Sequence, residues 1–116
     1  MRLTPAILKN LYASLYLCDP FIKWKLPLPE EIRFKVTDEI DALGTYLHDP
    51  SDEDYQHTIT ISKARCAFYT TVISTLCHEM IHLSRYRTDK WNYHDKMFRS
   101  RATMVGKELG FDHLEL

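Results

Sequence analysis

Apolar residues recur every three or four positions in three stretches of the chain, which is the spacing that gathers them on one face of a helix. The first stretch spans residues 1–20, where Thr4 is the expected N-cap and Pro5 the first helical residue. Lys9 and Asn10 interrupt its apolar run, and no small-residue cleavage site follows. This segment therefore predicts an amphipathic helix rather than a signal peptide or a membrane span.

Two further helices are predicted in the second half of the chain. The first spans residues 67–87, and the residues expected on its core side are Phe68, Val72, Ile73, Leu76, Met80, Ile81 and Leu83. The second runs from about residue 93 to Gly110, because glycine suits the C-terminal end of a helix. Its expected N-cap is Asn92, and the Asp95 side chain is expected to accept a hydrogen bond from the backbone N–H of Asn92, as in a capping box. Its expected packing residues are Met97, Phe98, Met104, Val105 and Leu109.

Between the first two helices, three short segments have the composition or the alternation of apolar and polar residues that is typical of strands, at residues 32–36, 42–47 and 57–61. Pro27 and Pro29 favour an extended connector before them, and the polar run 49–54 predicts a turn. We expect the strands to form a β-meander. With 116 residues, the chain is predicted to be one α+β domain, residues 1–116.

Residues 78–82, His-Glu-Met-Ile-His, have the form H-E-x-x-H and lie in the middle predicted helix. Residues four apart lie one above the other on a helix, so His78 and His82 can offer imidazole nitrogens to one metal ion with Glu79 beside it. A pair of core histidines satisfied by hydrogen bonds is the alternative. Two buried imidazoles beside a buried carboxylate would, however, be costly without a metal or partners.

A catalytic Zn²⁺ usually has three protein ligands and one water, so the motif predicts a third ligand elsewhere. His94 is favoured, because it stands in the expected first turn of the last helix; Asp89 lies in a connector and His113 near the end of the chain. Zinc held by three histidines would bring the pKa of its water near 7. Glu79 could then accept the proton of this water and deliver it to the leaving amine.

Other residues have candidate roles around this site. Tyr86, Tyr93 and Arg85 are close in sequence and could donate a hydrogen bond to the developing oxyanion. An extended peptide could bind by adding a strand to an exposed sheet edge. The candidate edge is the strand at residues 43–47, where Gly44 would permit close backbone approach; an internal strand with a bulge at Gly44 is the alternative.

The net charge of −1 conceals an uneven distribution. Residues 38–54 include seven acidic residues and no lysine or arginine, whereas residues 85–107 include seven basic residues and only two acidic ones. The basic set is either the solvated face of the last helices or a patch that rims the metal cleft and attracts nucleic acid or an acidic substrate. Such a patch would comprise Arg85, Arg87, Lys90, Arg99 and Arg101.

The chain has three cysteines, Cys18, Cys66 and Cys77, an odd number with no C-x-x-C pair. A disulfide framework is therefore not expected, and the pattern favours a reducing, cytoplasmic environment.

The order of these elements and motifs resembles the SprT-like zinc metalloprotease domain, the family of SprT and Spartan-like proteases. The resemblance is carried by residues 78–82 and by the H-x-x-x-F segment 94–98, preceded by 42–44 and 59–61. It implies a zincin-like core, a zinc cofactor and hydrolysis of a protein or peptide substrate. The family usually has glycine where Asp95 stands and often carries a zinc ribbon that this sequence lacks, so DNA targeting does not follow.

Two other functions fit the same residues. The chain could be a zinc-binding interaction or regulatory protein without catalysis, associated with nucleic acid, or a hydrolase that acts on a bond other than a peptide bond. Substituting Glu79→Gln separates the first of these from an enzyme, because binding would survive and catalysis would not.

Overall fold

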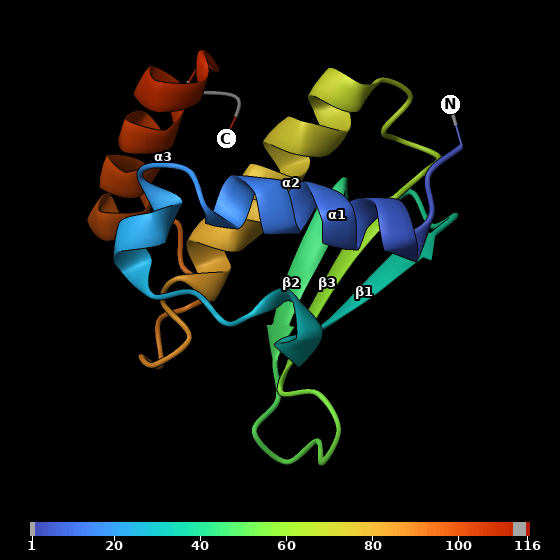
Figure 1. Ribbon diagram of the computed structural model, residues 1–116, viewed down its shortest axis with the longest axis horizontal. Helices are drawn as coiled ribbons and strands as arrows, with labels where there is room; N and C mark the ends of the chain where they lie inside the picture. Colours follow the sequence, from blue (N-terminus) through green and yellow to red (C-terminus); the bar gives the residue numbers. More distant parts are fainter. Residues whose placement is uncertain (1, 113–115) are drawn as a thin grey trace.

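The structure is a computed structural model that describes residues 2–112 and 116, and this part of the chain has an α+β architecture (Figure 1). Its regular elements are three α-helices, three strands and two short 3₁₀ turns. In chain order they are α1 (Pro5–Tyr16), η1 (Phe21–Trp24), η2 (Pro29–Glu31), β1 (Ile32–Thr37), β2 (Gly44–His48), β3 (His57–Ser62), α2 (Tyr69–Leu83) and α3 (Lys96–Leu109).

Helix α1 begins as predicted. The side chain of Thr4 accepts a hydrogen bond from the backbone nitrogen of Ile7 at 3.2 Å, and Pro5 is the first helical residue. Leu8 and Tyr12 are buried, and the Tyr12 ring packs against Phe34 of β1 with the ring centroids 5.5 Å apart. Helix α1 is thus anchored over β1.

The sheet has the order β1-β3-β2, so the predicted β-meander is wrong. Strand β3 lies between the other two, parallel to β1 and antiparallel to β2. The reason is burial: Ile59 and Ile61 on β3 are completely buried, whereas β2 exposes Thr45 and Leu47. The central strand is thus the one whose residues are most completely buried, including the polar His57 and Ser62.

Strand β2 is an edge strand, which confirms the prediction for this segment. Its register with β3 runs without interruption from Gly44 opposite Ile61 to His48 opposite His57, so there is no bulge at Gly44. A side chain at this glycine would meet helix α2, because an added Cβ would lie 2.8 Å from Cγ2 of Thr75. Glycine here allows α2 to lie close to the sheet edge.

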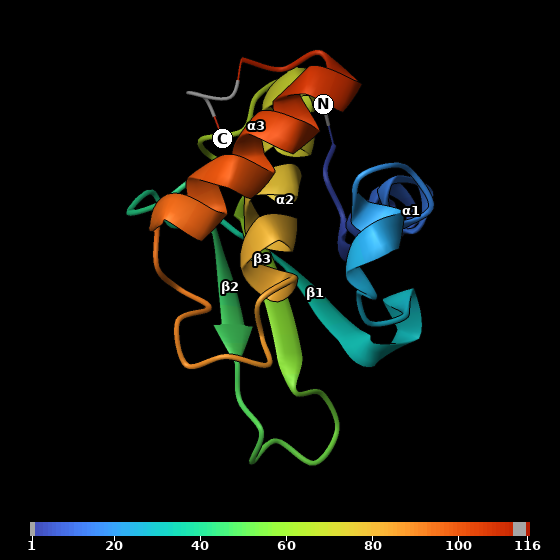
Figure 2. The same cartoon turned by 90° about the vertical axis from the view of Figure 1, so that its left-hand side faces the viewer.

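Helices α1 and α2 cover the same face of the sheet, α1 over β1 and α2 over β2 and β3, and α3 packs against α2 (Figures 1 and 2). The residues predicted for the core side of α2 are buried, with Ile73 partly so. Phe68 is the exception at 72% exposure. It is the N-cap residue and precedes the first helical turn, so it is not held on the core side.

Helix α3 begins at Lys96, and its N-cap is Asp95, not Asn92 as predicted. The Asp95 carboxylate accepts a hydrogen bond from the backbone nitrogen of Phe98 at 3.1 Å, which satisfies one of the free N–H groups of the first turn. Gly110 ends the helix in the left-handed conformation, as predicted. Phe98 and Val105 are buried and Leu109 partly so, whereas Met97 and Met104 are exposed.

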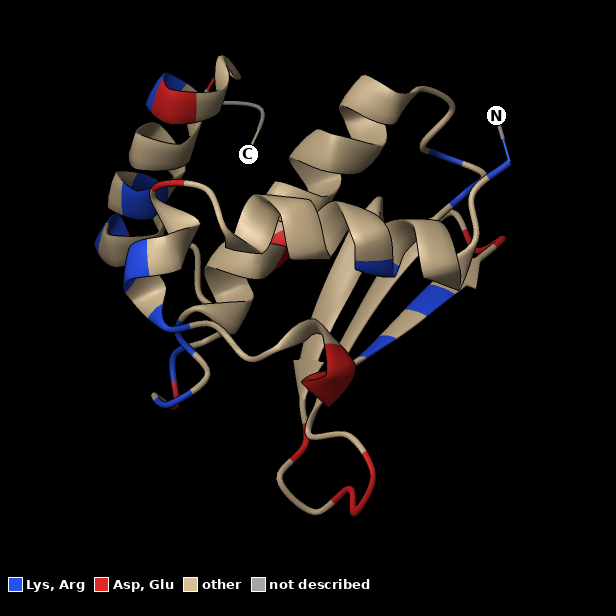
Figure 3. Cartoon of the chain, viewed as in Figure 1, with Lys and Arg blue, Asp and Glu red and all other residues tan. Residues whose placement is uncertain are grey.

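Charged residues are unevenly distributed over the fold (Figure 3). Lysines and arginines gather along α3 and the loop that precedes it, and acidic residues gather in the loop between β2 and β3. The three cysteines are not joined by disulfides; Cys18 is exposed, and Cys66 and Cys77 are buried. Within the described residues, no helix is long and apolar enough to cross a membrane.

Candidate metal centre

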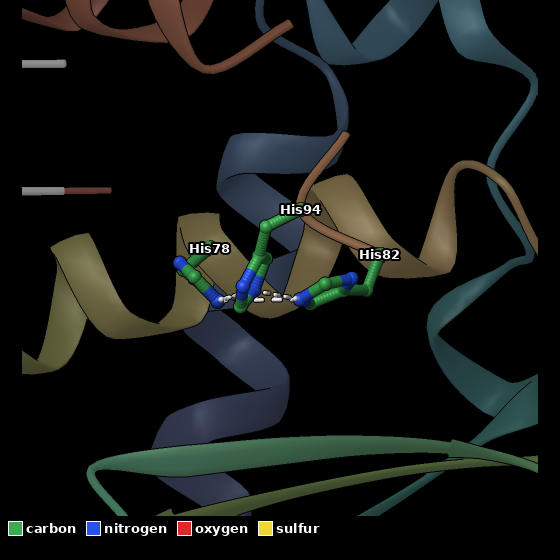
Figure 4. A group of neighbouring side chains, drawn as sticks. All are labelled: His78, His82 and His94. Carbon is green, nitrogen blue, oxygen red and sulfur yellow. Dashed lines mark hydrogen bonds between the residues drawn. The ribbon is translucent and has the colours of Figure 1, made fainter. Parts of the chain in front are cut away.

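The structure brings His78, His82 and His94 together (Figure 4). Helix α2 provides the first two from successive turns, and the loop before α3 provides the third. The Nε2 atom of His82 lies 3.2 Å from that of His78 and 3.0 Å from that of His94, and the remaining pair is 3.2 Å apart. Asp89 is not part of this group, and His113 lies outside the described residues.

The protonation of His82 follows from its second ring nitrogen. Nδ1 lies 2.7 Å from the backbone carbonyl oxygen of Trp91, and a carbonyl can only accept a hydrogen bond. In the neutral ring the proton is therefore on Nδ1, and Nε2 presents a lone pair to the other two histidines. Metal-binding histidines have the same arrangement, with the distal nitrogen held by a backbone or carboxylate acceptor.

The spacing of the three Nε2 atoms fits a metal ion. One lone pair on His82 cannot satisfy two neighbouring imidazoles, so hydrogen bonds alone leave the cluster incompletely paired. Three nitrogens separated by 3.0–3.2 Å can all lie about 2.0 to 2.1 Å from one ion, which is the usual zinc–imidazole distance. The donor set of three imidazoles suits zinc and other first-row transition metals.

The surroundings keep the motif histidines neutral, as ligation requires. The pKa of His82 is lowered to about 4, chiefly by burial and also by His78, His94 and Arg85, whereas the hydrogen bond to Trp91 opposes this shift. Burial, followed by the proximity of His94, also lowers the pKa of His78. The ring of Phe98 packs against all three imidazoles, at centroid distances of 4.6 to 4.9 Å, and shields one side of the cluster.

Glu79 lies beside the cluster but outside the donor set. It is 4% exposed, and burial raises the pKa of its carboxyl group to about 8. Glu79 and His78 line a cleft of about 280 Å³ between α2 and the start of β2. The other residues of this cleft are Leu43, Gly44, Arg65 and Thr75.

Sequence reasoning missed Thr75 and Arg65 as cleft residues. Thr75 precedes His78 by three positions, so helical spacing alone could have identified it as a neighbour on the same face. Arg65 has no such signal, because its position depends on the loop between β3 and α2. Its guanidinium group donates to the carbonyl oxygen of Ile40 at 3.2 Å.

The three predicted oxyanion donors do not line this cleft. The Arg85 guanidinium forms two hydrogen bonds to the carboxylate of Asp95, at 2.6 and 2.8 Å. Tyr86 packs against His57 with the ring centroids 4.6 Å apart and borders a different, acidic hollow. Tyr93 is half-exposed, and its backbone carbonyl faces Arg85.

The other arginines near the cluster also have partners within the chain. Arg87 donates to the carbonyl of Lys25 and lies over the Tyr86 ring. Arg99 donates to the carbonyl of His94, at 3.1 Å. The remaining one, Arg101, donates to the hydroxyl and carbonyl oxygens of Ser84 and lies over the Trp24 ring. These side chains thus tie the loop before α3 to its surroundings.

The model of the SprT-like family matches residues 22–115 of this chain. The match includes the whole sheet, α2, α3 and the three clustered histidines. No curated protein and no solved structure matched the chain.

Proposed function

The chain belongs to the SprT-like family, and from this membership and the histidine cluster we propose that it is a zinc-dependent metallopeptidase. Residues 1–116 would form a single domain with a zincin-like core. One observation supports this activity above the others: three Nε2 atoms converge beside a buried glutamate, at a cleft that borders a free sheet edge.

His78, His82 and His94 would hold the zinc ion. When bound, zinc supplies Lewis-acid chemistry that makes a water molecule nucleophilic at neutral pH. The chain's own contribution is to orient the imidazoles, through the Trp91 carbonyl at His82 and the packing of Phe98 against all three rings. The same packing keeps solvent away from one side of the cluster.

Glu79 would be the general base. Its carboxylate accepts a proton from the attacking water and, once protonated at the same group, delivers it to the leaving amine. A base acts best when its pKa is near the working pH, and burial moves the pKa of this carboxyl group towards neutrality. Because Glu79 is not in the donor set, its proton transfer does not compete with metal binding.

The substrate would be an extended segment of a protein or peptide, bound as an additional strand along the free edge of β2. Gly44 supports this geometry, since its missing side chain allows β2 to approach α2 and leaves the cleft beside Glu79. A peptide strand bound along this edge would lie beside the histidine cluster, and some of its backbone carbonyl groups would point into the cleft.

A non-catalytic zinc-binding protein associated with nucleic acid is the second candidate function. The gathering of lysines and arginines along α3 and the preceding loop favours it (Figure 3). Such a protein would bind its partner through charge and would not need a buried carboxyl group beside the metal.

A single comparison tests the enzymatic function. The zinc-loaded wild-type protein and its Glu79→Gln variant are incubated with a peptide library and with unfolded protein, and products are identified by mass spectrometry. The proposal expects cleavage by the wild type and loss of cleavage in the variant at unchanged zinc content. Equal products from both proteins would overturn it.

A further inference from the structure

The loop between α2 and α3, residues 84–95, places His94 next to His78 and His82 of α2. It consists of turns up to Asn92 and has no regular structure at Tyr93 and His94. The His94 side chain is exposed, so burial alone does not fix its position. A feature of the surrounding structure must therefore hold this residue in place.

The strongest connection across the loop is the pair of Arg85 and Asp95. Two parallel hydrogen bonds of 2.6 and 2.8 Å join the guanidinium group to the carboxylate, the geometry that makes such pairs strong and directional. Arg85 directly follows the α2 C-cap and is only 8% exposed. Asp95 is the N-cap of α3. One pair of side chains thus joins the end of the motif helix to the start of the next helix.

The same arginine and a second one also hold the backbone around His94. Arg85 donates to the carbonyl of Tyr93 at 3.4 Å, and Arg99 donates to the carbonyl of His94 at 3.1 Å. The peptide groups on both sides of His94 are therefore bound to arginines, and the next residue, Asp95, is held by its side chain. Few backbone rotations remain open to His94 under these restraints.

From these contacts we propose that Arg85 and Asp95 are positioning residues for His94, which hold it where it completes the metal centre. This inference rests on the role of His94 as a metal ligand in the proposed function. A positioning role predicts that loss of the pair weakens metal binding through His94, whereas a role in folding alone predicts lower stability with unchanged metal affinity.

Asp95→Asn is the most informative variant, because its amide oxygen can still cap α3 while the charge and one acceptor for Arg85 are lost. Arg85→Lys retains the charge but not the two-pronged geometry. Lys107→Gln, which removes a charge from the last turn of α3, is the matched control. Circular dichroism of each metal-free protein verifies that it is folded.

Zinc affinity is measured by chelator competition, and the site geometry by the visible spectrum of the Co²⁺-loaded proteins. We expect Asp95→Asn to bind zinc about 10- to 100-fold more weakly than wild type, in the range found for residues that orient metal ligands. The zinc affinity of Arg85→Lys should lie between those of wild type and Asp95→Asn, and the zinc affinity of Lys107→Gln should equal that of wild type. The Co²⁺ bands should change in Asp95→Asn and remain unchanged in the control.

The same substitution in a His94→Ala background tests whether the pair acts through His94. There Asp95→Asn should cause no further loss of zinc affinity, since the residue it positions is gone. Equal losses in both backgrounds, or wild-type zinc affinity in Asp95→Asn, would overturn the positioning role while leaving the proposed activity intact. Absence of zinc binding by the wild-type protein would overturn both.

Discussion

His82 donates its Nδ1 proton to the backbone carbonyl of Trp91 at 2.7 Å, and this bond determines which nitrogen faces the other two histidines. The carbonyl belongs to the loop that also carries His94, so the orientation of one histidine and the placement of another depend on the same segment. Helix α2 and this loop therefore build the histidine cluster together.

From this arrangement we expect about one Zn²⁺ per chain and a large loss of zinc affinity in His94→Ala, because two imidazoles on one helix form an incomplete site. Zinc content by elemental mass spectrometry and affinity by chelator competition test this expectation. Zinc binding by His94→Ala equal to wild type would show that His94 is not a ligand.

Removal of the metal should lower the stability of the fold. An ion that binds only the folded chain stabilises it by about 4 kcal/mol at a concentration 1,000 times its Kd, and here the ion would join α2 to the start of α3. Thermal unfolding with and without a chelator measures the effect. His94→Ala provides the control, since its midpoint should depend much less on the chelator.

Glu79→Gln should leave the fold and the zinc content intact and lower turnover by roughly 10²- to 10⁴-fold, because the amide has nearly the same shape but cannot accept the proton. Burial favours the neutral form at this position, so the variant should be at least as stable as wild type near pH 7. Peptidase activity near wild type would exclude a general base at Glu79.

The histidine cluster could be predicted from sequence because its signals are local. Helical spacing placed His78 and His82 on one face of a helix, and His94 followed within a short distance along the chain. The predicted cap of α3 is wrong, because the N-cap is Asp95 and not Asn92. Both residue types are good caps, and the partner that holds the Asp95 carboxylate, Arg85 at the end of α2, is not revealed by any local pattern.

The sheet topology could not be predicted in the same way. The composition of each segment indicates a strand, but apolar content does not give the order β1-β3-β2, since β1 has three apolar residues and the central β3 has two. The complete burial of Ile59 and Ile61 becomes visible only in the folded structure. Alternation with a period of two indicates a strand and gives no information about its partner.

Gly44→Ala should destabilise the protein by about 1 to 3 kcal/mol, the usual cost of inserting a methyl group into a tightly packed site. The new Cβ would lie 2.8 Å from Cγ2 of Thr75 and 3.0 Å from the carbonyl oxygen of Thr60. Thr75→Ser removes the nearer of these atoms, so the double variant should recover part of the loss. Urea unfolding of the four proteins measures this coupling, and strict additivity would contradict the packing explanation.

The protein should lose stability as the pH falls from about 6.5 to about 4, in part through His57. Burial, with smaller contributions from His48 and Arg87 and an opposing one from Glu31, lowers the pKa of this histidine to about 4. Nδ1 lies 2.8 Å from the Tyr46 hydroxyl, and the Tyr86 ring packs against the imidazole. Because the unfolded chain binds its proton near pH 6.5, protonation favours the unfolded state throughout this window.

His57→Asn tests this pH dependence, since it retains an acceptor for Tyr46 and removes the titrating group. The other histidines remain, so their contributions cancel when the two proteins are compared. Denaturant unfolding of the metal-free proteins between pH 4 and 7.5 should give a shallower pH dependence for the variant. Parallel curves for the two proteins would assign the acid sensitivity to other groups.

The last prediction concerns nucleic acid. Among the five basic residues that could form a patch, Arg85 is paired with Asp95, and the other three arginines donate to backbone carbonyls of the chain. A guanidinium group held in this way has fewer donors free for phosphate, and the net charge of −1 provides no general attraction. We therefore expect no binding of single- or double-stranded DNA at micromolar protein in a low-salt anisotropy titration.

DNA binding with an affinity that falls steeply as the salt concentration rises would contradict this expectation. The slope of affinity against salt concentration measures how many phosphates the basic residues neutralise. In that case Lys90→Gln and Arg99→Gln should reduce the slope, and Lys9→Gln, on α1, should leave it unchanged.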